Sequence, residues 1–517
     1  MGFALAIVFL LISVSGAGAQ TYGLDDEAAV SLSIKQARVL ALENNRDILM
    51  SKQSVRSAGA KIKAEKGKFD PVLEIKSFYE KENEPSASSF VSGGVQNRNF
   101  EASIGVSGVI PTGGYYDLFK ASVSREETDS PVQSLSPAFY SKMDMKIGHD
   151  LLRNFGLKTN KTFVITETLR AGIARDGLEI EVSDTLLKVE REYWNLAAAR
   201  SEHELRRQNL ELAIDLFERN LIKVREGVIP RLDEVKAASE VAKRRVDLIE
   251  AENRLRRASD ELKHTLGLPR SARVELTDRP GAHFHEGTEI TELIGKAFEN
   301  REELKTAFKK MEIAEQEKIF RANQRLPQLS VEGFLSLRGL AGDDNPASGS
   351  FDNFLPDSPA SFSGGFSDSV SRASQGDFLT WGASLTMSVS IGNRHAAGLY
   401  EAAQAEVNRA VFEHRKIKER VALEVRAAAD TAWSEHRRVE AADVALNLAE
   451  EVLEAEKEKY AAGISTTREV LEAQTELAEA KSKRVRALAD YQISLAALRR
   501  ATGTIIEEFV PASARGM

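Results

Sequence analysis

The feature that most limits the possible folds of this chain is an internal repeat, because one order of segments occurs twice along it. Two sets of residues recur at constant offsets, one shifted by 256 positions (297 minus 41) and the other by 236. The matched pairs include Asn44 with Asn300, Pro71 with Pro327, Gly227 with Gly463, and Gly267 with Gly503. Since each set keeps its internal spacing, we interpret the chain as two copies of one structural unit.

Each unit alternates helical and strand-rich segments, which predicts a rod. The first unit (20–270) has helical patterns over 31–66, 160–226 and 230–266, with strands within 69–148. The second unit (289–503) has helices over 289–324, 395–462 and 466–502, with strands within 327–392. A linker (271–288) joins the units and a tail (504–517) follows them. Each long segment spans about 100 Å as a helix, and the two shorter helices of a unit, stacked end to end, match that length.

Seven-residue spacings predict a left-handed coiled coil within the rod. The apolar set is Val241, Leu248, Leu255 and Leu262, and the small set is Ala473, Ala480, Ala487, Ser494 and Ala501. Small side chains allow helix axes to approach closely. A fibrous coiled-coil dimer is the alternative, and the strand-rich segments argue against it.

The strand-rich segments alternate polar and apolar residues, as in 72–80, 102–109, 142–147, 329–337 and 382–391. Such strands are typical of an outer-membrane barrel, although a soluble β-sandwich would alternate too. The long polar stretch 341–377 favours the barrel, because it exceeds a compact hairpin loop. A turn signal at 111–114 leaves open whether the first unit contributes two strands or four.

Composition and the N-terminus restrict the function classes. Residues 1–19 combine an apolar run with the small residues that precede a signal-peptide cleavage site; the usual basic residue is missing, and an uncleaved anchor is the alternative. The chain has no cysteine, which excludes disulfides, thiol catalysis and a lipidated N-terminal cysteine. Its net charge of -8 argues against nucleic-acid binding.

No enzymatic site emerges from the sequence. His283 and His285 form a His-x-His pair, but they lie in the linker without a carboxylate cluster, so a solvated linker is the preferred interpretation over a metal site. The other histidines are scattered over polar helices and form no nucleophile, base and orienting group. We therefore expect no catalytic residues, metal or cofactor.

Taken together, the segments resemble the TolC-like outer-membrane efflux protein family, also called outer membrane factors, over nearly the whole mature chain. The motifs that carry the resemblance are the doubled layout, Phe69-Asp70-Pro71 and Leu326-Pro327 before the strands, the segment 149–156 after them, and the tips around Gly227 and Gly463. The resemblance implies a mainly α protein with membrane β structure, in which a homotrimer forms an outer-membrane β-barrel continuous with a periplasmic α-helical coiled-coil barrel.

The resemblance also implies partners and a function. A periplasmic adaptor (membrane fusion) protein and an inner-membrane pump of RND or ABC type would complete a tripartite efflux or type I secretion system around a passive conduit set in outer-membrane lipid. The exported substrate stays open. A non-conducting, periplasm-spanning structural protein of the same fold is the alternative.

The segment 460–473 is similar to the family's periplasmic gate. Tyr460 falls at a gating tyrosine, and Glu469 and Glu472 fall at two acidic positions that ring the tunnel entrance. Ser465 departs from the pattern, because a gating arginine stands there in the best-known member, and Arg468 is a candidate substitute.

Glu469 and Glu472 are three residues apart and therefore share one helical face, which supports an acidic ring. Threefold symmetry would gather six carboxylates at a constriction, favouring cations and raising some carboxyl pKa values by mutual repulsion. Two ordinary solvated glutamates are the alternative. The resemblance further implies adaptor docking at the two tips, at Gly227, Val228, Gly463 and Ile464.

Overall fold

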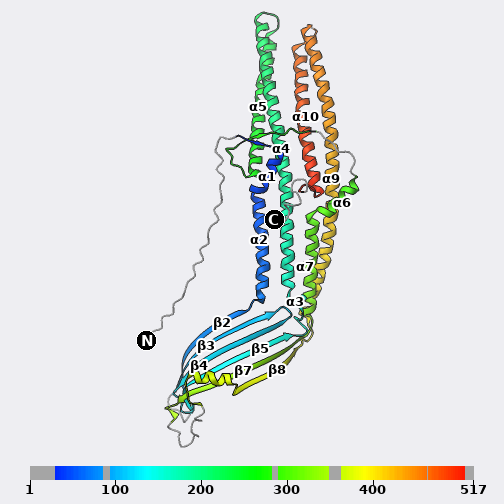
Figure 1. The fold of residues 1–517 in the computed structure, drawn as a ribbon. Coiled ribbons are helices and arrows are strands. Elements are labelled where there is room, and N and C mark those ends of the chain that lie inside the picture. Colours follow the sequence, from blue (N-terminus) through cyan, green and yellow to red (C-terminus); the bar gives the residue numbers. More distant parts are fainter. Residues whose placement is uncertain (1–28, 86–93, 282–288, 349–361, 463, 507–517) are drawn as a thin grey trace.

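The computed structural model describes residues 29–85, 94–281, 289–348, 362–462 and 464–506. The predicted signal peptide (1–19) therefore lies outside the described residues. A six-stranded sheet forms one end of the molecule, and helices run away from it to two helical hairpins at the other end (Figure 1). The shape is a rod attached to a sheet, as the repeat predicted.

Each repeat builds its part of the rod from one long helix and two shorter ones stacked end to end (Figure 1). In the first repeat, α4 (Thr162–Arg225) packs against α2 (Arg46–Lys66) and α5 (Arg231–Leu266). In the second, α9 (Arg394–Ala461) packs against α7 (Glu302–Gln324) and α10 (Thr467–Ala501). The 68 residues of α9 correspond to about 102 Å. The short elements η1 (Gly67–Phe69) and α3 (Leu157–Asn160) connect the rod to the sheet.

The prediction of single helices over 31–66 and 289–324 is wrong. The first is a short strand, β1 (Ala29–Leu32), followed by α1 (Ile34–Asn44) and α2, and the second is α6 (Ile290–Asn300) followed by α7. Asn45 and Arg301 separate the helices with extended backbones, at ψ of 127° and 119°. The Asn45 side chain explains the first break, since its oxygen accepts the N–H groups of Asp47 and Ile48 and begins α2.

The residue at each break forms a hydrogen bond to the end of another helix of the same repeat, which is α5 in the first repeat and α10 in the second. Asn45 donates from its side-chain amide to the carbonyl of Thr265, at 3.0 Å. Arg301 donates from its guanidinium to the carbonyl of Ala501, at 3.1 Å. Thr265 and Ala501 are related by the shift of 236, whereas Asn45 and Arg301 are related by the shift of 256. The residues of the two shifts therefore contact each other at one place in each repeat. We name this place the helix junction; it comprises 44–45 with 265–267 in the first repeat and 300–301 with 501–503 in the second.

Glycine is required at each helix junction. Gly267 and Gly503 follow the ends of α5 and α10 with left-handed φ values of 69° and 75°. A Cβ atom on Gly267 would lie 3.0 Å from atoms of Asn44, and one on Gly503 would lie 2.8 Å from the Cβ of Asn300. The repeated glycines therefore serve both the turn and the close approach of the helices.

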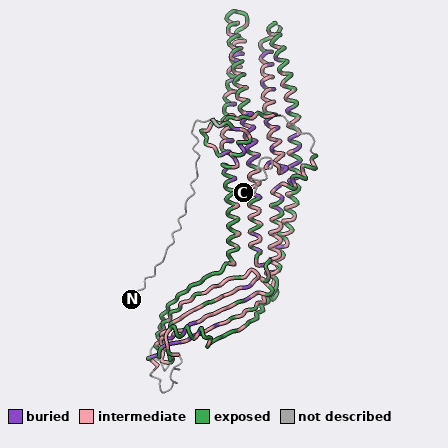
Figure 2. Tube along the Cα trace, viewed as in Figure 1, coloured by how far each residue is buried: buried purple, intermediate pink, exposed green. Residues whose placement is uncertain are grey.

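Buried side chains concentrate around the helix junctions, halfway along the rod (Figure 2). There β1 pairs in parallel with β6 (Arg273–Leu276), a strand within the predicted linker. The buried carboxylate of Glu190 in α4 accepts hydrogen bonds from Arg38 of α1 at 2.7 Å and from Arg499 of α10 at 3.1 Å. Glu190 thereby ties the two repeats together.

The small heptad positions of α10 confirm the predicted close packing. All five are buried: Ala473, Ala480, Ala487, Ser494 and Ala501. The apolar heptad positions of α5 differ in burial: Leu262 is fully buried, whereas Val241 and Leu248 are partly exposed in the single chain.

The sheet is antiparallel throughout, in the order β2-β3-β4-β5-β7-β8. Its strands are β2 (Val72–Glu84), β3 (Val95–Ile110), β4 (Gly114–Thr128), β5 (Leu135–Asp150), β7 (Gln328–Asp344) and β8 (Phe378–Ser388). The first repeat thus contributes four strands and the second two, because the predicted turn at 111–114 does join β3 to β4. A helix that the sequence did not predict, α8 (Phe366–Gln375), packs against β5 and β7.

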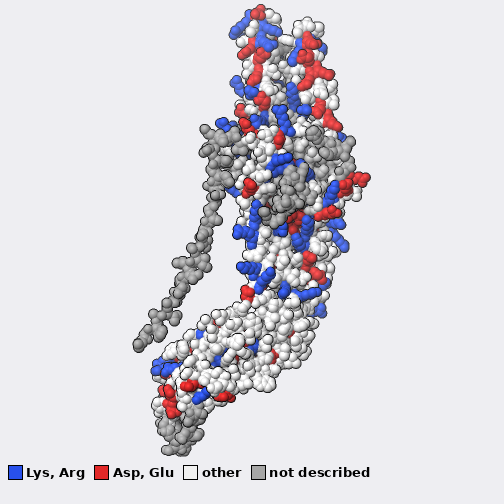
Figure 3. Space-filling view, viewed as in Figure 1, with Lys and Arg blue, Asp and Glu red and all other residues white. Residues whose placement is uncertain are grey.

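The two faces of the sheet differ sharply, as alternation and strand register show. The apolar face carries Leu73, Ile75, Ile104, Val123, Met143, Met145, Ile147, Leu329, Val331, Leu335, Leu337, Trp381, Leu385 and Met387. The polar face carries Glu74, Lys76, Asp117, Lys120, Lys142, Asp144, Lys146, Glu332 and Arg338. In Figure 3, the visible face of the sheet has few charged side chains beside the densely charged helices.

Candidate functional site at the helical tips

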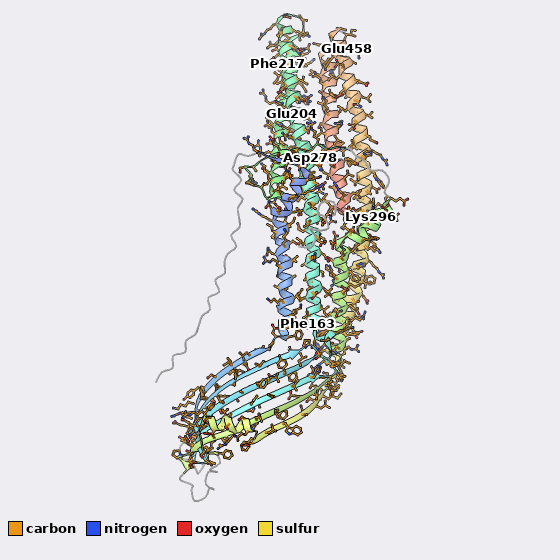
Figure 4. The ribbon with its side chains drawn as sticks, in the orientation of Figure 1. Phe163, Glu204, Phe217, Asp278, Lys296 and Glu458 are labelled. Atoms are coloured by element: carbon orange, nitrogen blue, oxygen red, sulfur yellow. The ribbon has the colours of Figure 1, made fainter. Side chains whose placement is uncertain are left out.

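The two hairpins end in short turns at the far end of the rod from the sheet. Figure 4 marks Phe217 on α4 and Glu458 on α9, one near each tip. At the α4–α5 turn, Gly227 has a left-handed φ of 74° and its missing Cβ would meet no neighbouring atom. Val228 at this tip and Ile464 at the other are 66% and 79% exposed, so both apolar side chains are available to a partner. Gly463 lies outside the described residues.

Tyr460 links the two hairpins. The Lys223 ammonium on α4 donates a hydrogen bond to the Tyr460 hydroxyl on α9, at 2.7 Å. The same ammonium lies 4.7 Å from the centre of the Tyr460 ring, within the range of a cation–π contact. Sequence reasoning identified Tyr460 but missed Lys223, which no motif distinguishes from the other lysines of α4.

Glu469 is held by the start of its own helix. Its carboxylate accepts the Thr466 backbone N–H at 2.6 Å, and the Thr466 hydroxyl lies 3.0 Å from the same oxygen. The Ser465 hydroxyl lies 2.9 Å from Glu469 and 2.7 Å from Glu456, so its single proton serves one carboxylate at a time. Thr466 and Glu469 form a capping box that begins α10.

These contacts lower the pKa of Glu469, mainly through the Thr466 backbone N–H and then through the two hydroxyls. The rise in carboxyl pKa predicted from carboxylate crowding concerns three copies together and stays a prediction. Glu456 behaves similarly, since Lys459 and then Ser465 lower its pKa.

Glu472 and Arg468 pair along α10. The Arg468 Nε donates to a Glu472 carboxylate oxygen at 2.9 Å, and both side chains are largely exposed. Glu472 raises the pKa of the Arg468 guanidinium. In this chain Arg468 therefore balances an acidic residue of its own helix, and its role as a gating arginine stays a prediction.

Further polar contacts join the hairpins below the tips. The Arg244 guanidinium of α5 is buried, pairs with Glu240 at 2.7 Å and donates to the Thr475 hydroxyl of α10 at 2.8 Å. Deeper still, the Ser482 hydroxyl of α10 donates to Glu202 of α4 at 2.5 Å. The hairpins are thus connected at several levels, and Lys223 with Tyr460 is the outermost of these contacts.

Comparison with known families decides what kind of protein carries these tips. The chain matches the family described as "Outer membrane efflux protein" over residues 168–268 and 293–504, more than half of its length. The chain belongs to the outer membrane efflux protein family. The matched ranges comprise most of the helical rod of both repeats of this efflux protein. No curated protein sequence matches it.

Solved structures of outer-membrane channels share the fold of this efflux protein. The channel OprN is 14% identical, with a TM-score of 0.65 over 91% of this chain and 90% of that chain. CmeC of Campylobacter jejuni is 12% identical, with a TM-score of 0.65 over 96% and 94%. VceC of Vibrio cholerae is 15% identical, with a TM-score of 0.62 over 91% and 96%. At these identities the likeness is one of fold.

Family and fold together place the efflux protein in the outer membrane, with its helical rod in the periplasm and a role in transport. The chemistry of the sheet agrees, because an apolar face suits lipid and a polar face suits an aqueous passage. Ion pairs on the polar face include Lys142 with Asp144 at 2.7 Å and Lys146 with Glu332 at 3.0 Å.

Among the described residues, no group of three or more histidine, aspartate or glutamate side chains is arranged to hold a metal ion. His283 and His285 lie outside the described residues. Within the same described part, no helix combines the length and apolar character needed to cross a membrane.

Proposed function

We propose that this efflux protein is the outer-membrane channel of a tripartite export system, a passive conduit from periplasm to exterior that is gated at its helical tips. An inner-membrane pump of RND or ABC type supplies the energy, and a periplasmic adaptor connects the pump to the tips. The observation that carries the proposal is a sheet with one polar and one apolar face, continuous with a charged helical rod about 100 Å long. Efflux and type I secretion both fit this architecture.

The open edges of the sheet support a homotrimer. β2 and β8 are the edge strands, and each has one side without a partner strand in the described part of the single chain. Unpaired backbone groups in lipid cost several kcal/mol each, and six strands are too few to enclose a passage. Because successive strands in the sheet alternate in direction, β8 of one copy can pair antiparallel with β2 of the next, and three copies of the six-stranded sheet give an 18-stranded barrel.

The tips support a gate. Lys223 and Tyr460 hold the α4–α5 hairpin against the α9–α10 hairpin, so separating the hairpins requires breaking this contact. Glu469 and Glu472 lie exposed on the first turns of α10, where threefold symmetry brings six carboxylates around the entrance. The lowered pKa of Glu469 keeps its charge at neutral pH, which favours cations at the entrance.

Adaptor docking at the tips follows from their exposed apolar residues. Val228 and Ile464 are among the most exposed large apolar side chains in the described part of the chain, and they lie on turns that a partner can reach. Gly227 lies in the first of these turns, and Gly463 directly precedes Ile464 in the sequence.

Conductance in planar bilayers tests the proposal directly. Purified protein should give small, cation-selective steps, and Tyr460→Phe should lengthen the open periods. The alternative is a non-conducting structural protein of the same fold. Silence of the wild type, persisting in a Lys223→Met, Tyr460→Phe double variant that still assembles as trimers, would establish that alternative.

A further inference from the structure

The helix α8 lies on the apolar face of the sheet, near the end of the strands that points away from the rod. Ser369 and Ala373 form the line of α8 that contacts the sheet, and both are buried. The Ser141 hydroxyl on β5 donates to the Ser369 carbonyl at 2.7 Å. Ser141 pairs with Gly339 of β7, and by strand alternation both share the face of Met143 and Leu337.

Gly339 makes this contact possible. A Cβ atom at Gly339 would lie 1.9 Å from the Ser369 carbonyl oxygen and 2.8 Å from the Ala373 nitrogen. Real Cβ atoms do not approach backbone atoms so closely, so the glycine is what lets the helix rest against the strand. The apolar face therefore carries a helix at a site built to receive one.

The position of α8 along the strands corresponds to the outer boundary of the membrane. The apolar residues of β7 run from Leu329 to Leu337, and Gly339 lies about 33 Å from Leu329 along the strand at 3.3 Å per residue, which is about 25 Å of height at a strand tilt of about 40°. The apolar band of outer-membrane barrels is about 25 Å tall. Gly339, beneath α8, follows at once, and the exposed acidic residues Asp343 and Asp344 come next.

The side chains of α8 are divided in the way that such a boundary requires. Phe366 and Val370 lie one turn apart on one flank of the line that contacts the sheet, and they are 46% and 41% exposed. Arg372 lies on the other flank, donates to the Leu340 carbonyl at 2.6 Å and lies over the Phe362 ring at 5.4 Å. The side opposite the sheet is polar, with Ser367, Asp368, Ser371, Ser374 and Gln375.

We propose that α8 is an interfacial lipid-binding helix, which inserts Phe366 and Val370 among the acyl chains just below the headgroups of the outer leaflet. A helix with one apolar stripe and one polar side adopts this position at a membrane surface. The occupant of the apolar flank is lipid, since the helix is continuous with the lipid-facing side of the sheet. A neighbouring copy joins the sheet beyond β2 or β8, whereas α8 rests on β5 and β7, inside those edges.

The test uses fluorescent labels at single cysteines, which is clean because the chain has no native cysteine. Phe366→Cys and Val370→Cys carry an environment-sensitive fluorophore in the full-length protein, reconstituted in vesicles with lipids brominated high on the acyl chain. Ser371→Cys, on the polar side of α8, is the matched control. Leu385→Cys on the apolar face and Val132→Cys in the exposed β4–β5 turn calibrate lipid and water.

The labels at 366 and 370 should be quenched by brominated lipid at least about twofold more than the label at 371, and should approach the label at 385. Quenching by aqueous iodide, as at 132, would overturn the proposal. Protection from both quenchers would also overturn it, because protein would then cover the flank. The labels at 366 and 370 are in separate variants, so each tests the proposal by itself. Trimer mobility in detergent gels checks that each labelled variant assembles correctly. None of these readouts depends on conduction, so a silent channel leaves this test unaffected.

Discussion

The hydrogen bond between Lys223 and Tyr460 predicts how strongly one hydroxyl group holds the periplasmic end closed. Tyr460→Phe removes the hydroxyl that accepts from Lys223 at 2.7 Å and keeps the ring 4.7 Å from the same ammonium. The bond involves a charged donor, which strengthens it, but both side chains are partly exposed, so its contribution is about 1 kcal/mol per chain.

The effect on opening depends on how many tips move together. If three tips open as one, the loss is about 3 kcal/mol, which raises the ratio of open to closed channels about 150-fold; a single independent tip would give about fivefold. The assay is the open probability of single channels in planar bilayers, compared with wild type at one voltage and salt concentration.

Lys459→Met is the matched control, because Lys459 is the repeat counterpart of Lys223 (459 minus 223 is 236). Lys459 pairs with Glu456 of its own helix at 2.6 Å and, among the described residues, makes no ion pair to the other hairpin, so its loss should leave the open probability near wild type. An open probability of Tyr460→Phe no greater than that of Lys459→Met would refute the reasoning.

Three further variants or conditions test other parts of the structure. Cation selectivity, measured as reversal potential, should stay constant from pH 7 to 5. It should fall only below pH 4.5, the ordinary pKa of a glutamate, since the capping contacts lower the pKa of Glu469. A fall between pH 7 and 5 would mean that repulsion between carboxylates of neighbouring copies outweighs the capping contacts. Arg301→Met should destabilise the rod by about 1–2 kcal/mol in urea unfolding, because it removes the hydrogen bond from the buried guanidinium to the Ala501 carbonyl, while Arg500 still pairs with the two carboxylates; an unchanged midpoint would contradict the role of the helix junction. Gly503→Ala should cost at least about 1 kcal/mol in the same assay, through its positive φ and its contact with Asn300, and Gly59→Ala, within α2 with open space around it, should not.

The sequence predicted the parts of the fold that repeat or follow a regular period. The shifts of 256 and 236 located both repeats, and the heptad of small residues from Ala473 to Ala501 predicted a buried stripe that is buried at all five positions. The break at Asn45 was detectable, because asparagine is a favoured helix cap and Asp47 follows in the first turn. Arg301 carries no such signal, and only its place in the repeat indicates a second break.

The contacts between hairpins were not predictable. Lys223 reaches Tyr460 because of the rotation of α4 against α9, which depends on the packing of the whole rod. The helix α8 was also missed, since ten residues rich in serine resemble a loop until Gly339 is placed beneath them. The predicted roles of Glu469, Glu472 and the docking residues remain predictions, because they concern copies and partners beyond one chain.

The helix junctions have a mechanical consequence for the distance over which the tips can move. Glu190 and the surrounding buried residues fix the middle of the rod, so each hairpin above that level is a stiff lever arm attached at its base. From Glu190 to Arg225 at the end of α4 is 35 residues, or about 52 Å. A rotation of about 5° at the base therefore displaces the tip by about 5 Å. That displacement exceeds the reach of the bond between Lys223 and Tyr460, so a small pivot at the junction parts the tips once the contacts of Arg244 with Thr475 and of Ser482 with Glu202 also yield.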